Sequence, residues 1–289
     1  MLPRLYVFGC GFLFVCLSGC AVWKKKTDSD MPLLPATRMS SDSVVLEIVF
    51  VHLPRDAKSL VELTWQELDE QHLPFEVRRK LNDNGIRCGV AGVQLPRPLQ
   101  ELLEHQDNRR QVDSEFGAPR IGKTAGLKRI QSRAGLRNEI ITSPQRRQMT
   151  MMISEDGKVK GETCYQATCK MIVRTFPQGD GRVKFELIPE VHHGELRPSY
   201  VGGENVFRIE MSQQKHVIEL LGMETTLSLG QTLVLGATEN AIGLGARFFT
   251  DESMGKPQPK LILIRLAQTQ YDDLFAQDKI DTSVAHTME

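Results

Sequence analysis

Net charge, aromatic side chains and long apolar runs are all scarce in this chain of 289 residues. Basic and acidic residues balance at 36 each, so no overall charge attracts nucleic acid. Aromatic residues make up only 6% of the chain, and Phe116 is the one aromatic residue in the basic stretch at 109–147, where a nucleic-acid reader would usually place side chains on which bases stack. No apolar run reaches the roughly 20 residues that a helix needs to cross a bilayer. These shortages argue against a nucleic-acid partner and against a membrane-spanning helix.

Motifs of hydrolytic enzymes are also lacking, because neither G-x-S-x-G nor H-E-x-x-H occurs. Serine, histidine and aspartate are present, but sequence alone gives them no catalytic geometry. A hydrophobic content of 40% is typical of a globular protein. We therefore predict no catalytic residue, no cofactor and no metal ligand. The alternative is an anchored envelope hydrolase or metal-dependent enzyme whose site is assembled from distant residues.

The start of the chain has the organisation of an export signal. Arg4 is followed by a charge-free run over residues 5–17, which has the length of the apolar region of a signal peptide. The run ends in Leu17-Ser18-Gly19-Cys20, which resembles the lipobox of bacterial lipoproteins. The resemblance implies that residues 1–19 are a signal peptide and that Cys20 is acylated. The protein would then be held on the exported side of a bacterial membrane.

The remaining organisation is predicted to be α+β. Lys24, Lys25 and Lys26 suit anionic lipid headgroups and begin a tether over residues 20–43. Beyond the tether we expect a small α/β unit at 44–106, a basic linker with an edge strand at 107–147, a β-rich antiparallel domain at 148–270 and a tail at 271–289.

The α/β unit is predicted from its hydrophobic periodicity. Residues 44–53 (VVLEIVFVHL) are apolar on both faces, as in a buried central strand. Apolar residues at helical spacing over 57–68 predict a first helix, and a second helix should run from Pro74 to Asn84-Gly85. A strand at 86–90 and a helix around residues 99–103 complete the unit.

Three cysteines remain after Cys20: Cys88, Cys164 and Cys169. An exported protein can form a disulfide, but three thiols are not a disulfide framework. Cys164 and Cys169 lie five residues apart in one predicted strand, so alternation would place them on opposite faces. We interpret all three as small buried apolar residues and leave a disulfide open.

The segment Gly117–Thr124 (GAPRIGKT) matches the nucleotide-binding pattern G-x-x-x-x-G-K-[ST]. In a true P-loop a buried strand delivers the loop and a helix leaves it, so that backbone amides hold the phosphates. The polar residues before Gly117 do not fit a buried strand. We therefore expect no nucleotide at Lys123 and interpret the segment as part of a basic, Gly-containing linker.

Glu190, His192, His193 and Glu195 form the densest group of metal-type ligands. In a strand, Glu190 and His192 share one face, while His193 and Glu195 share the other. Two ligands on each face are fewer than the three or four of a zinc site. The sequence alone therefore favours an ordinary strand end.

Four segments follow one another in the last third of the chain: VKFELIPEV (183–191), TTLSLGQTLVLGA (225–237), GLGARFF (243–249) and PKLILIRL (259–266). In this order they resemble the C-terminal domain of bacterial secretins, the ring-forming outer-membrane channels of secretion and pilus systems. The Pro-rich gate segment of that family is largely missing after Gly236. The resemblance therefore implies a reduced, secretin-like β domain used for assembly or binding.

Two expectations follow from this resemblance and from the local pattern. The strands at 225–229, 231–237 and 260–266 should be antiparallel neighbours, with a hairpin turn at Gly230-Gln231-Thr232. The protein should act as a membrane-anchored structural or interaction module in the envelope. Its expected partners are the membrane, through acylated Cys20, and either further copies of itself or an envelope assembly protein.

Overall fold

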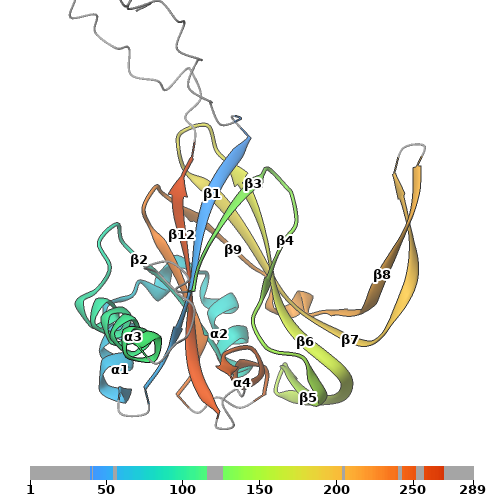
Figure 1. Cartoon of the computed structure of the whole chain (residues 1–289), viewed down its shortest axis with the longest axis horizontal. Coiled ribbons are helices and arrows are strands. Elements are labelled where there is room, and N and C mark those ends of the chain that lie inside the picture. The colour runs from blue at the N-terminus through green and yellow to red at the C-terminus, as the bar shows by residue number, and fades with distance from the viewer. Residues whose placement is uncertain are drawn as a thin grey trace, which may run out of the picture. The chain divides into compact units, whose positions relative to one another are not determined.

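A computed structural model of the chain describes residues 40, 42–54, 57–115, 126–203, 206–239, 243–251 and 257–269. The predicted signal peptide, Cys20 and the tail lie outside these residues. The described chain consists mostly of antiparallel β structure in two sheets, with a few helices (Figure 1).

The elements of the first hundred residues agree with the predicted ones. They are β1 (Ser43–His52), α1 (Lys58–Glu67), a short 3-10 turn (Glu70–His72), α2 (Phe75–Asp83), β2 (Ile86–Ala91) and α3 (Arg97–Glu115). Pro74 immediately precedes α2, and its fixed φ favours the start of a helix at this point. At the other end, the buried Asn84 amide donates to the carbonyls of Lys80 and Ser154, which ties the helix to a strand of the other sheet.

The later elements are nearly all strands. They are β3 (Leu127–Arg133), β4 (Asn138–Ile141), β5 (Arg146–Glu155), β6 (Lys158–Pro177), β7 (Val183–Gly203), β8 (Val206–Val217), a 3-10 turn (Glu219–Leu221), β9 (Met223–Leu227), β10 (Thr232–Ala237), α4 (Leu244–Phe248), β11 (Thr250–Asp251) and β12 (Gln258–Gln268). Asp156 and Gly157 both have positive φ and turn the chain between β5 and β6, as the Asp-Gly pair predicts.

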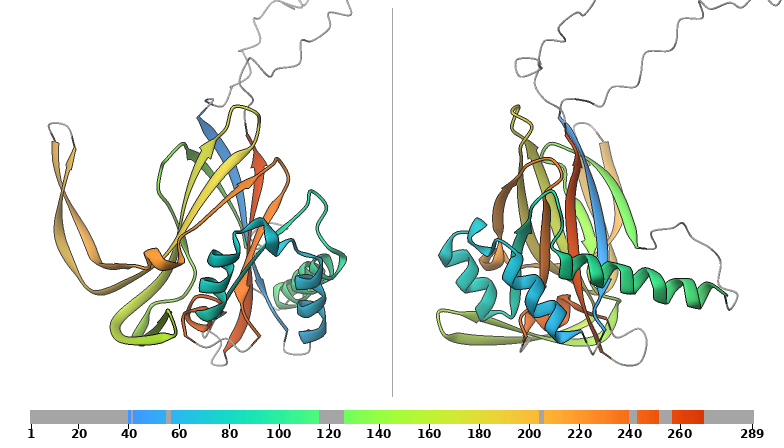
Figure 2. Two further views of the ribbon diagram at one scale, coloured as in Figure 1. Left: turned by 180° about the vertical axis from the view of Figure 1, so that it is seen from behind. Right: turned by 90° about the vertical axis from the view of Figure 1, so that its left-hand side faces the viewer.

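The two sheets pack face to face and share one core. The first sheet has the order β2-β10-β12-β1-β3, with β11 also on β12. The second has the order β4-β6-β7-β8, with β5 on β6 and β9 on β7. Side chains such as Leu46, Ile262 and Phe185 fill the space between the sheets. Helices α1 and α3 cover the outer face of the first sheet, where Trp65 and Leu102 pack (Figures 1 and 2).

The predicted separation of an α/β unit from a β-rich domain needs correction. Strand β1 lies between β12 and β3, and β2 pairs with β10. Residues 44–106 therefore do not form a sheet of their own, because the described strands that pair with their two strands are β3, β10 and β12, all beyond residue 126. Periodicity had shown where strands occur but not which strands pair.

The expected hairpin at Gly230-Gln231-Thr232 is wrong. Strand β9 pairs with β7 in the second sheet, whereas β10 pairs with β12 and β2 in the first, so the turn carries the chain from one sheet to the other. Gly230 has a φ of 84°, which suits a turn of either kind. The other half of the expectation is confirmed, because β12 is central and antiparallel to β10.

The predicted basic linker is largely ordered structure. Helix α3 extends to Glu115, β3 forms an edge of the first sheet, and β4 forms the expected edge strand of the second. Two of its described basic side chains have partners elsewhere in the chain: Arg129 lies 3.1 Å from Glu47, and the buried Arg146 donates to the carbonyls of Arg247 and Thr250. Only Ile130 and Ser132 of β3 face inward, so the alternation of apolar and polar residues is weak. For this reason the sequence pattern did not predict the strand.

Candidate functional site

The three described cysteines are buried and free, as interpreted from the sequence. However, Cys164 and Cys169 do not face opposite sides, since both side chains point into the core. Gln166 lies between them with a φ of 51° and adds one residue to the alternation of β6. Burial raises the pKa of Cys164 to about 11, with the Glu162 carboxylate adding to the effect, and burial also raises the pKa values of Cys88 and Cys169.

Glu190 and His192 share one face of β7, as predicted, and the group around them is a buried charge cluster. Glu190 is only 3% exposed, and both of its oxygens accept from Arg137, each at 2.6 Å. The His192 imidazole lies 2.9 Å from the same carboxylate. A bidentate guanidinium of this kind binds and neutralises a carboxylate strongly.

Glu139 and Lys170 extend this cluster onto β4 and β6. Lys170 Nζ lies 2.6 Å from Glu139, which also accepts from Arg137 at 3.0 Å. Burial would raise the pKa of Glu139, but the hydrogen bonds from Lys170 and Arg137 lower it to about 2. Burial likewise lowers the pKa of His192, against the opposing effect of Glu190. The cluster cross-links three elements, and its carboxylates are already bound to cations of the protein.

His193 belongs to a different group, which sequence reasoning missed. Its imidazole, the thiol of Cys164 and the carboxylate of Glu162 have donor atoms within 4.8 Å of one another. His216 on β8 joins them, because its Nδ1 lies 3.2 Å from Glu162. Counting ligands along β7 alone found too few for a metal site, since the others come from β6. Glu195 lies within the irregular stretch of β7 between His193 and Arg197, and it lines a separate surface hollow with Arg147 and Leu196.

Two backbone irregularities occur close to this group. Gln166 of β6 has its left-handed conformation, and the pairing of β7 with β8 shifts register between His193 and Arg197, where Gly194 has a φ of 79°. One side-chain amide spans both, because Gln213 donates to the carbonyls of Gln166 at 3.1 Å and of Gly194 at 2.8 Å. Bulges often lie beside functional sites, where they redirect side chains.

Past His192, β7 pairs only with β8 among the described strands, and the two continue as a ribbon that projects from the sheets (Figures 1 and 2). We call residues 197–203 and 206–212 the arm. Ile209 is 62% exposed and Met211 is 60% exposed. Leu196, at the base of the arm, is 62% exposed. The arm therefore combines exposed apolar side chains with strand edges that no described strand of this chain covers.

A further buried cation lies on the first sheet. Lys260 of β12 is buried beside the Phe50 ring, 5.5 Å from its centre, and burial lowers the pKa of this lysine while Asp251 opposes the shift. Asp251 itself lies 3.3 Å from His52. His52, Asp251 and Lys260 thus connect β1, β11 and β12 at one end of the sheet.

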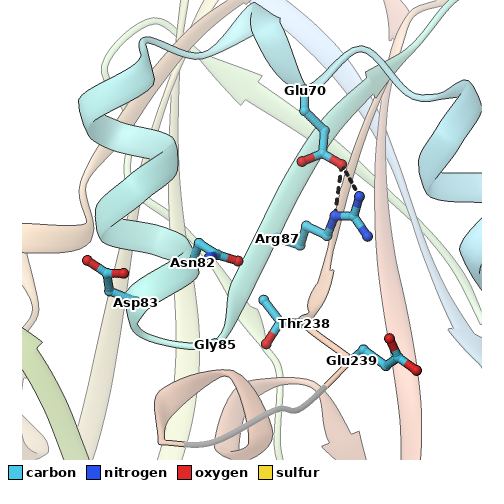
Figure 3. Close-up of a pocket in the computed structure, with 7 residues that line it drawn as sticks. All are labelled: Glu70, Asn82, Asp83, Gly85, Arg87, Thr238 and Glu239. Carbon is cyan, nitrogen blue, oxygen red and sulfur yellow. Dashed lines mark hydrogen bonds and ion pairs between the residues drawn. The ribbon is translucent and has the colours of Figure 1, made fainter.

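A surface hollow lies where α2, β2 and the end of β10 meet (Figure 3). Arg87 binds one oxygen of Glu70 through two nitrogens, at 2.8 and 2.6 Å, and stacks 4.8 Å from the Trp65 ring. Asp83 and Glu239 line the rest of the hollow. Its one arginine is thus already paired, and the remaining charged groups are acidic.

The segment that matches the P-loop pattern, Gly117–Thr124, lies outside the described residues. The elements on either side are described, and they are helix α3 before it and strand β3 after it. This order is the reverse of the strand–loop–helix order that positions phosphate in a P-loop.

Within the described residues, no helix is long and apolar enough to cross a membrane. No family model, no curated protein and no solved structure matches this chain.

Proposed function

We propose that this protein is an exported, lipid-anchored interaction module of the bacterial envelope, held by acyl chains on Cys20 and self-associating through the arm. The observation that carries the proposal of self-association is the arm itself, with Ile209 and Met211 mostly exposed. The lipobox-like Leu17-Ser18-Gly19-Cys20 supports the anchor. The resemblance of the last third to secretin C-terminal domains supports a role in an assembly of the secretion or pilus type.

The arm is the part of the fold least supported by its own chain. A two-stranded ribbon is marginally stable in water unless a third strand or another layer covers it. Unpaired backbone groups along a strand edge are also a template for pairing with another strand. Since the described residues supply no third strand beside residues 206–212, a strand from another chain would stabilise the arm.

A second copy of this chain suits that position. Antiparallel pairing of two β8 strands about Ile209 places this residue of each copy opposite the same residue of the other. Two isoleucine side chains that are mostly exposed in one chain would then pack against each other across the strand pair. Such an interface uses the same surface on both copies, as a two-fold dimer requires.

An enzymatic role finds less support in the same residues. A cysteine nucleophile needs a lowered pKa, whereas burial raises the pKa values of all three described thiols. Glu190 and His192 resemble an oriented carboxylate–histidine pair, but Arg137 occupies both oxygens of the carboxylate.

The anchor is tested by Cys20→Ser. We expect this variant to lose its acyl chains and to leave the membrane fraction, while the wild type stays there. Cys88→Ala, which keeps the lipobox, is the control. A Cys20→Ser protein that stays membrane-bound after a carbonate wash would contradict acyl anchoring.

The assembly is tested by the mass of the native protein in detergent. We expect a dimer or larger oligomer for the wild type and a monomer for Ile209→Lys, because a charge would be placed in the apolar contact. Val159→Lys is the matched control, since Val159 is equally exposed on the β5–β6 hairpin, away from the arm. A monomeric wild type, or an Ile209→Lys variant with the wild-type mass, would refute self-association through the arm.

A further inference from the structure

We propose that Glu162, Cys164 and His193 form a Zn²⁺ site at the place where the arm leaves the second sheet. The inference does not depend on self-association, because it concerns one chain and rests on side chains at the base of the arm.

The three side chains come from two strands and converge on one point. Glu162 and Cys164 are two residues apart on β6 and therefore point to the same side. His193 is the first residue of β7 beyond its pairing with β6, which ends at the Thr168–His192 pair. All three donor atoms lie within 4.8 Å of one another. A tetrahedral zinc ion holds its donors roughly 3.5 Å apart, so a contraction of about 1 Å would complete the geometry.

The donor types select the metal. A thiolate, an imidazole and a carboxylate are all common zinc ligands. Ca²⁺ and Mg²⁺ prefer oxygen ligands alone and do not suit a cysteine–histidine pair. Three protein ligands leave a fourth position for water or for a group from another molecule, and the half-exposed Glu162 places that position toward solvent.

His216 has the position of a second layer around this site. Its Nδ1 lies 3.2 Å from Glu162, so it can fix the orientation of the carboxylate. Hydrogen bonds of this kind orient metal ligands in many sites. His216 thus acts as a positioning residue, and through it the site connects β6 and β7 to β8.

The backbone irregularities are what make this convergence possible. Ala167, Cys169 and Met171 of β6 face the core. If the alternation of this strand were regular, Cys164 would therefore face outward. The left-handed Gln166 shifts the alternation by one residue, and Cys164 faces inward as well. The register shift after His193 and the Gln213 side chain then hold the two irregular strands together. A non-glycine residue with positive φ carries strain, which is commonly retained where function requires it.

Zinc bound here would fix how the arm leaves the sheet. The arm starts four residues after His193, and the ribbon has no support from β6 beyond that point. A metal bridge between β6 and β7, with β8 attached through His216, would restrain the base of the arm.

The test uses the full-length protein in detergent, stripped of metal with a chelator and then titrated with Co²⁺ as a spectroscopic probe for Zn²⁺. We expect one Co²⁺ per chain and a thiolate-to-cobalt charge-transfer band that excess Zn²⁺ abolishes. Cys164→Ser should remove the band, and His193→Gln and Glu162→Gln should each weaken binding by at least about tenfold. His216→Gln should keep the band and weaken binding by about 10–100-fold, as loss of an orienting group does.

Two variants serve as matched controls. Cys88→Ala removes a buried thiol from the other sheet, and His105→Gln removes an exposed imidazole from α3, so both should bind Co²⁺ like the wild type. Absence of Co²⁺ binding at micromolar metal would overturn the proposal, and so would a band that persists in Cys164→Ser. If Cys164→Ser does not fold, as judged by circular dichroism, His193→Gln and Glu162→Gln decide, because unchanged binding in both would also overturn it. A protein that binds Co²⁺ as expected but stays monomeric would contradict the self-association and leave the metal site intact.

Discussion

Isoleucines of the body, by which we mean the two packed sheets and their helices without the arm, and of the arm have opposite surroundings, although both lie on β-strands. Ile262 on β12 is fully buried, with β1 and β10 on either side and the second sheet across the core. Ile209 on β8 is 62% exposed, and β7 alone pairs with its strand among those described. In the body, neighbouring strands of the same chain pair with β12 and bury its isoleucine. In the arm, the same kind of residue is exposed to solvent. The arm is therefore the part of the described fold that is available for contact with another molecule.

The largest expected effect is on thermal stability, and it comes from comparing the same substitution, isoleucine to aspartate, in the body and in the arm. Ile262→Asp should unfold the body, because it removes about 1.5–3 kcal/mol of apolar burial and places a carboxylate in the apolar core between the sheets. Ile209→Asp should leave the melting temperature nearly unchanged, since surface substitutions usually change stability by about 0.5 kcal/mol or less. Thermal unfolding followed by circular dichroism measures both.

Dilute samples keep this measurement separate from self-association. At low concentration the wild type and Ile209→Asp should melt together, while at high concentration the wild type should gain stability from association. Folded Ile262→Asp with near-normal melting would show that the two regions do not differ as described.

Local elements were largely predictable from the sequence because their signals are local. Pro74 and Asn84 bound α2 through conformation and capping, and Asp156-Gly157 turns the chain through positive φ. The pairing of strands was less predictable, since apolar residues on two faces do not reveal a partner. The sequence therefore placed β9 and β10 in one hairpin, although each contributes to a different sheet.

The group formed by Glu162, Cys164 and His193 was not found from the sequence for a related reason. Alternation within β7 correctly separated His192 from His193, but the remaining donors come from β6. The left-handed Gln166 then reverses the face on which Cys164 was expected. No residue type in that segment signals a bulge, because glutamine rarely adopts positive φ. Two histidines and two acidic residues within one strand, with a cysteine in the strand before, are the only hint that the sequence offers.

A smaller effect within the body is expected from the buried charge cluster. Arg137→Ala leaves Glu190 buried without its cation, and removing one partner of a buried ion pair typically costs about 3–5 kcal/mol. Urea unfolding measures the change. Arg129→Ala is the matched control: its ion pair with Glu47 is mostly exposed on the arginine side and should contribute at most about 1 kcal/mol. Equal effects of the two substitutions would mean that the cluster has no special role in the body.

The smallest effect is a pH dependence that belongs to the body alone. The pKa of Glu139 is lowered to about 2, and the pKa values of Glu190 and His192 are also lower than usual. All three groups bind protons less tightly in the folded than in the unfolded protein, so acid favours unfolding. The contribution of His192 should fade as the pH falls below about 6.5, and those of the carboxylates as it falls from about 4.3 toward 2.

Urea unfolding at about pH 7 and pH 5 should therefore show a smaller loss of stability in His192→Gln than in the wild type. Ile209→Asp should follow the wild type, since the arm contributes none of these groups. If His192→Gln loses as much stability as the wild type between these two pH values, the histidine is not held neutral by burial, and the cluster would not account for the acid sensitivity of the body.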